Sequence, residues 1–187
     1  GGNGIERCHP FLRESNWMTR TLVVAGNFNL TNTDELFQRL VTIGQHPKDR
    51  SDTVTVLEKI GHYLDKTTIR MEEVCIAGGM TRREAEAYIA KNLDVMEILR
   101  SACEHWDGGY VIAGLIGHGD SFVLRDPAGI RPAFYYVDDE VAVVTSERPV
   151  IQTTFNIQDE SLIHELPPGH AIVIKRYGAI TVEPYTT

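Results

Sequence analysis

The sequence predicts an α+β domain, with helices in the first half of the chain and antiparallel strands in the second. Hydrophobic residues recur at helical spacing between residues 31 and 106. After residues 107–109 the chain changes to short β-branched or aromatic runs separated by Gly, Asp and Pro. No internal repeat or low-complexity segment interrupts this order. Helices followed by antiparallel strands are typical of a layered α+β fold.

The helical half opens with a short apolar strand at residues 21–25 and a helix from Thr31 to Val41. Asn32 and Glu35 have the spacing of a capping box, and Gly44 is placed to end the helix. The hydrophobic residues that share one face of this helix are Leu36, Phe37, Leu40 and Val41.

Two further helices are predicted. The first covers residues 52–64, and the second is one long helix over residues 81–106 that begins with a capping box of Thr81 and Glu84. The hydrophobic residues on one side of the 52–64 helix are Val56, Leu57, Ile60 and Leu64.

The second half predicts strands at residues 110–117, 121–126, 133–137 and 140–146. The final stretch, residues 170–185, reads as a hairpin that turns at Tyr177 and Gly178.

Composition excludes several classes of protein. The formal net charge is −8 at pH 7 and the pI is near 5.3, which argues against a nucleic-acid partner because phosphate binding needs clustered Lys and Arg. No run is long enough to span a bilayer, and we expect neither a membrane partner nor a signal peptide. Cys8, Cys75 and Cys103 are far apart and form no C-x-x-C pair, which favours a reducing, cytosolic compartment. The seven histidines show no metal-ligand spacing.

Two asparagines near residue 28 draw attention because asparagine is poor in strands and in helix interiors. We expect Gly26, Asn27, Phe28 and Asn29 to form a corner between the 21–25 strand and the next helix. An Asn amide beside a backbone N–H is a pair of donors suited to a developing oxyanion. Asparagines in a turn also satisfy backbone groups, and the residues alone leave both interpretations open.

Two other stretches carry polar groups at element boundaries. Either Ser51 or Asp52 is a good N-cap for the helix that follows, and capping alone explains such a residue. The segment RDPAGIRP, residues 125–132, reads by itself as a tight turn with an ion pair across it.

Taken in order, these stretches resemble the class II glutamine amidotransferases, which use an N-terminal cysteine nucleophile, and among them the amidophosphoribosyltransferases. That family has His-Asn-Gly-Asn-Leu-Thr-Asn, then Ser-Asp-Thr, then Arg-Asp-Pro-x-Gly-Ile-Arg-Pro, with Ser-Glu and Pro-Gly-Glu further on. The resemblance spans roughly residues 9–176. The matching segments here are Gly26–Asn32, Ser51–Thr53, Arg125–Pro132, Ser146–Glu147 and Pro168–Gly169.

The resemblance implies an Ntn-hydrolase-like, four-layer αββα sandwich and a role for each matched residue. The side-chain amide of Asn27 and the N–H of Phe28 would stabilise the oxyanion, and Asp52 would hold the glutamine α-amino group. Ammonia from glutamine would serve a phosphoribosyltransferase domain beyond residue 187, which would form phosphoribosylamine from phosphoribosyl pyrophosphate in purine synthesis. Mg²⁺ is expected in that domain, no cofactor in this one, and a homo-oligomer for the full-length protein.

The sequence departs from the family pattern in three respects. Gly26 stands where the family has histidine, and Phe28 stands where it has glycine, so a positive φ at Phe28 would be costly. The nucleophilic cysteine and the family's Gly-His-x-Arg-Tyr-Ser-Thr motif are absent from the chain, and Cys8 is not at an N-terminus. We therefore expect residues 1–187 to form part of a glutaminase domain, an incomplete sandwich that is inactive alone.

Two alternatives stay open. The aromatic run after residue 132 also suits the glutaminase domain of an asparagine-synthetase-like enzyme. The departures at Gly26 and Phe28 also suit a non-catalytic binding module that has kept the fold.

Overall fold

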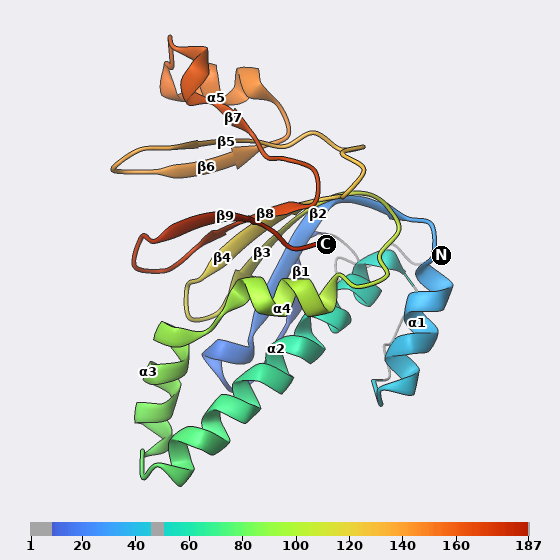
Figure 1. Cartoon of the computed structure of the whole chain (residues 1–187), viewed down its shortest axis with the longest axis vertical. Helices are drawn as coiled ribbons and strands as arrows, with labels where there is room; N and C mark the ends of the chain where they lie inside the picture. The colour runs from blue at the N-terminus through green and yellow to red at the C-terminus, as the bar shows by residue number, and fades with distance from the viewer. Residues whose placement is uncertain (1–8, 46–50, 187) are drawn as a thin grey trace.

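The computed structural model of the chain describes residues 9–45 and 51–186, which form two antiparallel sheets with helices on their outer faces (Figure 1). The larger sheet has the strand order β1-β2-β3-β4-β8-β9, and the smaller sheet has the order β6-β5-β7. The strands are β1 Phe11–Arg13, β2 Leu22–Leu30, β3 Gly108–Ile116, β4 Ser121–Arg125, β5 Phe134–Val137, β6 Ala142–Thr145, β7 His164–Glu165, β8 His170–Ile174 and β9 Ile180–Pro184. The helices are α1 Thr33–Thr42, α2 Asp52–Ala77, α3 Arg82–Asn92, α4 Val95–Ala102 and α5 Arg148–Phe155, with short 3-10 turns at Met18–Arg20 and Glu160–Leu162.

The elements stack in four layers. Helices α1 to α4 lie on one side of the larger sheet, the smaller sheet lies on its other side, and α5 covers the outer face of the smaller sheet (Figure 1). The expected α+β class and its αββα layering are therefore confirmed.

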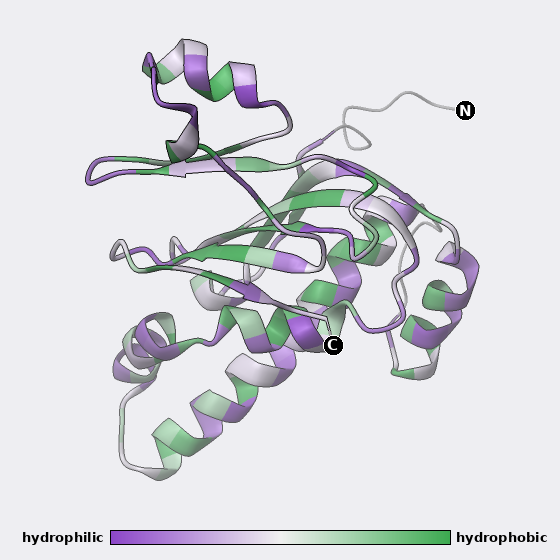
Figure 2. Ribbon diagram, turned by 45° about the horizontal axis from the view of Figure 1, so that its top comes forward, coloured by the Kyte–Doolittle hydropathy of each residue, from purple (hydrophilic) through white to green (hydrophobic). Residues whose placement is uncertain are grey.

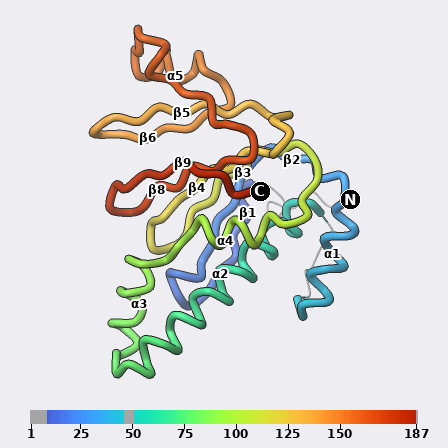
Figure 3. The backbone as a smooth tube through the Cα atoms, in the orientation of Figure 1, coloured from blue at the N-terminus to red at the C-terminus, as the bar shows by residue number. Residues whose placement is uncertain are grey.

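Strands β2 and β3 form the longest strand pair of the larger sheet. They pair along nine residues of each strand, from Leu22 opposite Ile116 to Leu30 opposite Gly108. The backbone trace shows β2 beside β3, two strands that are far apart in the sequence (Figure 3). The predicted strands and the hairpin at Gly178, where φ is +91°, are confirmed.

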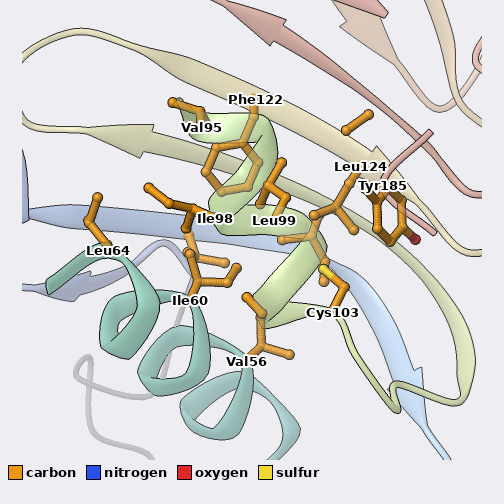
Figure 4. Close-up of a cluster of buried hydrophobic side chains, with 14 of the residues drawn as sticks. Val56, Ile60, Leu64, Val95, Ile98, Leu99, Cys103, Phe122, Leu124 and Tyr185 are labelled. Carbon is orange, nitrogen blue, oxygen red and sulfur yellow. The ribbon is translucent and has the colours of Figure 1, made fainter. Parts of the chain in front are cut away.

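The main hydrophobic core lies between the larger sheet and helices α2 and α4. Leu99 and Leu124 are fully buried in it, and Figure 4 shows side chains from α2, α4 and β4 meeting there. Truncation of such a buried leucine to alanine typically costs about 2–5 kcal/mol. The predicted face of the 52–64 helix is confirmed, because its four hydrophobic residues all belong to this core.

The helices differ from the prediction in their lengths. Helix α2 runs on to Ala77, and the single helix expected at residues 81–106 is two helices. The break falls at Leu93, which is extended, and Asp94 then caps α4 by accepting the Glu97 N–H at 3.0 Å. A new N-cap therefore restarts the chain in a different direction. The capping box of Thr81 and Glu84 is confirmed.

The capping box expected from Asn32 is wrong. The Asn32 side chain makes no cap hydrogen bond and instead donates to the His105 carbonyl at 2.7 Å and accepts the Asp107 N–H at 3.3 Å. It therefore ties the start of α1 to the loop before β3. Gly44, with φ of +86°, ends the helix region as predicted, whereas Val41 is exposed rather than on the buried face.

Hydropathy colouring agrees with this layering. Figure 2 shows helices that carry both hydrophobic and hydrophilic residues and central strands that are hydrophobic over much of their length. Among the described residues, no helix is both long and apolar enough to cross a membrane.

Helix α5 was not predicted. It is only eight residues long, and its proline in the first turn is typical of a helix start.

Lys59 is a buried cation in α2. Its side chain donates to the Glu104 carbonyl and lies 5.8 Å from the centre of the Trp106 ring. Burial lowers the pKa of Lys59 from 10.5 to about 8, because the charged form loses hydration.

This shift predicts a stability that increases with pH above 8. Between pH 8 and 10.5 the unfolded chain binds more protons at Lys59 than the folded chain does, so the free energy of unfolding rises with pH. The whole difference between the two pKa values corresponds to a rise of about 3 kcal/mol. Urea denaturation at pH 7.5, 8.5 and 9.5 measures this rise. Lys59→Met should flatten the rise, and equal slopes for both proteins would contradict the assignment.

Candidate functional site

The asparagine segment is a strand and not the corner we expected. Gly26 to Asn29 lie within β2, and Asn27 and Asn29 pair with Val111 and Gly109 of β3. Pairing with the central strand outweighs the poor strand preference of asparagine, because strand propensity depends strongly on context. The chain leaves the strand only after Leu30.

The backbone N–H of Phe28 points away from β3. The Tyr110 carbonyl accepts the N–H of Asp126, which shows that the backbone N–H and C=O of Tyr110 point towards β4. Phe28 lies opposite Tyr110 in the β2–β3 pairing. Because Tyr110 points away from β2, these two residues form a non-hydrogen-bonded pair. Phe28 therefore directs its N–H to the β1 edge of the strand, where the described pairing with β1 ends at Val24. The N–H is thus placed at an edge of the sheet beyond that pairing.

The side chain of Asn27 faces the other sheet. Side chains alternate along a strand, and Asn27 lies opposite Val111, which packs between the two sheets. Asn27 is exposed and lines a groove of about 530 Å³ between the sheets. The other residues that line it are Ala25, Gly26, Val111, Ala113, Val123, Arg131, Pro132, Val144, Thr145, Ser146 and Glu147.

Asp52 lies at the same edge of β2 as the Phe28 N–H. Ser51 is the N-cap of α2, so Asp52 does not cap the helix, and its carboxylate accepts the Leu30 N–H at 3.3 Å. Leu30 and Phe28 are two residues apart and direct their N–H groups to the same side of the strand. Asp52 is not among the described residues that line the inter-sheet groove. The structure therefore brings Asp52 near the Phe28 edge, while the Asn27 side chain faces the groove.

The RDPAGIRP turn is held by a buried carboxylate. Asp126 is fully buried and accepts the N–H groups of Tyr110, Ile130 and Arg131 at 3.3, 2.8 and 3.0 Å. The ion pair expected across the turn is wrong, because Arg125 pairs with Glu165 of β7 at 2.7 Å. The turn thus joins the larger sheet to the smaller one.

The other matched segments surround this turn. Ser146 and Glu147 line the groove, and the N–H of Gly169 donates to the Asp126 carbonyl at 3.1 Å. Arg131 and Glu147 lie in two of the matched motifs, but the motifs alone give them no role in a site. Only the folded structure shows that both residues line the same groove as Asn27. No group of three or more metal-ligating side chains occurs within residues 9–45 and 51–186.

The two departures near Asn27 have a structural explanation. Phe28 is an ordinary strand residue and is not among the positive-φ residues, so the expected strain is absent. Gly26 lies so close to β3 that an added Cβ would be 2.4 Å from the Val111 carbonyl oxygen. This strand therefore excludes the histidine found in the family pattern unless β3 moves.

Comparison with known proteins supports the fold. No protein-family model matches the sequence, and no curated protein matches it. A glutamine phosphoribosylpyrophosphate amidotransferase from B. subtilis, in complex with ADP and GMP, matches 98% of this chain with a TM-score of 0.62 and 21% identity. A structure of the allosteric regulatory enzyme of purine biosynthesis matches 99% of it with a TM-score of 0.63 and 21% identity. The chain spans about a third of each, 33% and 32%. The chain thus has the fold found in the matching third of both proteins.

Gly26 gives a test of the local backbone. Gly26→Ala should destabilise the protein by about 1–3 kcal/mol, because the new methyl group overlaps the backbone of β3. Urea denaturation measures the change. Gly78→Ala is the matched control, since an added Cβ there meets its nearest atoms at 3.4 Å, and it should change stability by less than about 0.5 kcal/mol. Equal effects of the two substitutions would show that β2 and β3 are farther apart than described.

Proposed function

We propose that the chain is the glutaminase domain of an amidophosphoribosyltransferase-type enzyme, which hydrolyses glutamine and supplies the ammonia for phosphoribosylamine formation. One observation carries the proposal. Consecutive residues of β2 present two hydrogen-bond donors, the Asn27 amide in the inter-sheet groove and the Phe28 N–H at the strand edge. The pairing of β2 with β3 holds the backbone of both residues, and donors on a held backbone suit an oxyanion because they need little reorganisation when charge develops.

The edge of β2 also fits the length of glutamine. A strand rises about 3.3 Å per residue, so the N–H groups of Phe28 and Leu30 are about 7 Å apart along the edge. Standard bond lengths separate the amide oxygen and the α-amino nitrogen of extended glutamine by about 6 Å. With the amide oxygen at Phe28, the ammonium group would lie near Asp52, which already binds the Leu30 N–H. A carboxylate and an ammonium group form a strong charge-assisted pair.

The remaining parts of the proposal concern the longer protein. The nucleophile would be an N-terminal cysteine of that protein, and Cys8 lies outside the described residues. The chain covers about a third of the two longer chains that it matches, which supports a longer protein. In the proposal, that protein carries an ammonia-accepting phosphoribosyltransferase domain, which would hold Mg²⁺. A cytosolic location and a homo-oligomeric full-length protein belong to the same proposal.

The oxyanion role predicts a loss of turnover. In the full-length protein, Asn27→Ala should lower kcat for glutamine hydrolysis by about 10²- to 10³-fold, the effect of removing one such donor. Ammonia release measures it. Asn29→Ala is the matched control, because Asn29 is also exposed on the same face of β2 but does not line the groove, and it should change kcat by less than about threefold.

Covalent labelling of the full-length protein distinguishes a catalytic glutaminase domain from a domain that only binds glutamine. A glutamine analogue bearing an electrophile should label an N-terminal cysteine of the full-length protein. A folded protein that binds glutamine but is neither labelled nor active would instead be a non-catalytic module with this fold.

Asp52 predicts an effect on binding. Asp52→Asn keeps an oxygen acceptor for Leu30 but loses the charge, so KM for glutamine should rise about tenfold or more, since a hydrogen bond to a charged group contributes about 1.5–3 kcal/mol. Stability should change little. The control is Asp34→Asn, in the first turn of α1, which should leave KM unaltered. An unchanged KM in the Asp52 variant would remove Asp52 from the site.

A further inference from the structure

A second groove lies among helices α2, α3 and α4, on the side of the larger sheet that faces away from the smaller sheet (Figure 1). We call it the helical groove. It is lined by α2 from Tyr63 to Cys75, together with Tyr88 of α3 and Ser101 of α4. Its volume of about 530 Å³ is within the usual range for small-molecule sites. None of the residues proposed for glutamine hydrolysis lines it.

The helical groove has an apolar floor and exposed apolar walls. Met71 is half-buried and packs against the main core, and Cys75 is buried, so the groove reaches down to the protein interior. Val74 and Tyr88 line the groove although 68% and 45% of their surfaces are exposed. Exposed apolar side chains that gather around a concave site, rather than scatter singly, are typical of a ligand-binding groove.

Two cations lie along the rim of the helical groove. Lys66 and Arg70 are one helical turn apart on α2, and both are exposed. Lys66 lies 5.8 Å from the centre of the Tyr63 ring, and neither cation forms an ion pair within residues 9–45 and 51–186. Like charges at this spacing disfavour a helix slightly, so the pair does not serve the stability of α2.

The acidic residues near these cations are engaged elsewhere. A row of them on the other face of α2 pairs with arginines that precede β2. These pairs are Arg13 with Glu58, Arg13 with Asp65, and Arg20 with Glu72. Glu97 lines the helical groove, but its carboxylate lies 3.7 Å from Arg100. The groove therefore combines an apolar floor with positive charge that the described acidic side chains do not pair.

We infer that the helical groove binds a medium-chain fatty carboxylate, with the carboxylate at Lys66 and Arg70 and the chain directed towards Cys75. Cys75 follows Lys66 by nine residues in α2, a separation of about 14 Å along the helix. An extended hydrocarbon chain advances about 1.2 Å per bond, so about twelve carbons cover this distance. The floor lies at a buried residue, which a single chain can reach and the surface of a bilayer cannot. The ligand is therefore a free monomer.

Calorimetric titration of the 187-residue chain with dodecanoate, below its micelle concentration, tests the inference. One dodecanoate should bind per chain. Octanoate should bind at least about tenfold more weakly, because fewer methylene groups are buried. Dodecyltrimethylammonium has the same chain with a positive head group and should bind about fivefold more weakly or less tightly still, because Lys66 and Arg70 repel it.

Variants assign the binding to the helical groove. Lys66→Gln combined with Arg70→Gln should weaken dodecanoate about fivefold or more and remove the preference over dodecyltrimethylammonium. Lys91→Gln changes an exposed cation of α3 outside the groove and should leave both affinities unchanged. Val74→Asp should weaken dodecanoate, whereas Ile76→Asp, at an exposed position outside the groove, should not. Thermal unfolding of each variant confirms that the fold is retained.

Several results would overturn the inference. These are the absence of saturable dodecanoate binding, equal affinity for the cationic amphiphile, and equal effects of the groove variants and their controls. Sedimentation with phosphatidylglycerol vesicles without binding of monomeric dodecanoate would assign the residues to a membrane surface instead. Dimerisation of the ligand-free chain that Val74→Asp abolishes and Ile76→Asp retains would show that a second copy covers the groove. Each of these results leaves the proposed glutaminase function standing, because its residues lie outside the helical groove.

Discussion

The buried carboxylate of Asp126 holds together the parts of the molecule that form the groove. It accepts one N–H from the central strand β3 and two from the turn that leads to the smaller sheet. A buried charge is tolerated only when its lone pairs are satisfied, and removal of such an acceptor would leave three donors unpaired. Arg125 completes the junction by binding Glu165 of β7 in the smaller sheet and the carbonyl of Leu166, the next residue. The spacing between the sheets at Asn27 thus depends on this network.

Much of the fold could be predicted from local pattern, and the exceptions have physical causes. Helical periodicity gave the buried face of α2, and the capping box of Thr81 was confirmed because both partners lie within one helical turn. Asn32 has the same spacing to a glutamate, but its amide finds partners in the loop before β3. The strand through Asn27 and Asn29 depends on β3, which is distant in sequence. Such tertiary partners override local preference.

The candidate site was predicted only in part, for a related reason. The motifs identified Asn27, Phe28 and Asp52, but they do not give the direction of a side chain. Direction follows from the strand register, which places the Asn27 amide between the sheets and the Phe28 N–H at the edge. Arg131 and Glu147 belong to motifs noticed in the sequence, and their meeting across one groove depends on how the two sheets are joined.

The division of roles along β2 explains why the strand accommodates unusual residues. A role carried by a backbone N–H is independent of the side chain, so phenylalanine at position 28 presents the same donor as glycine, while its ring packs against the helical core. Gly26 is constrained instead by the closeness of β3, which leaves no space for a side chain. Asn27 is the one residue of the three whose side chain must supply chemistry in the proposed function. The strand therefore keeps both donors even though the residues on either side of Asn27 differ from the family pattern.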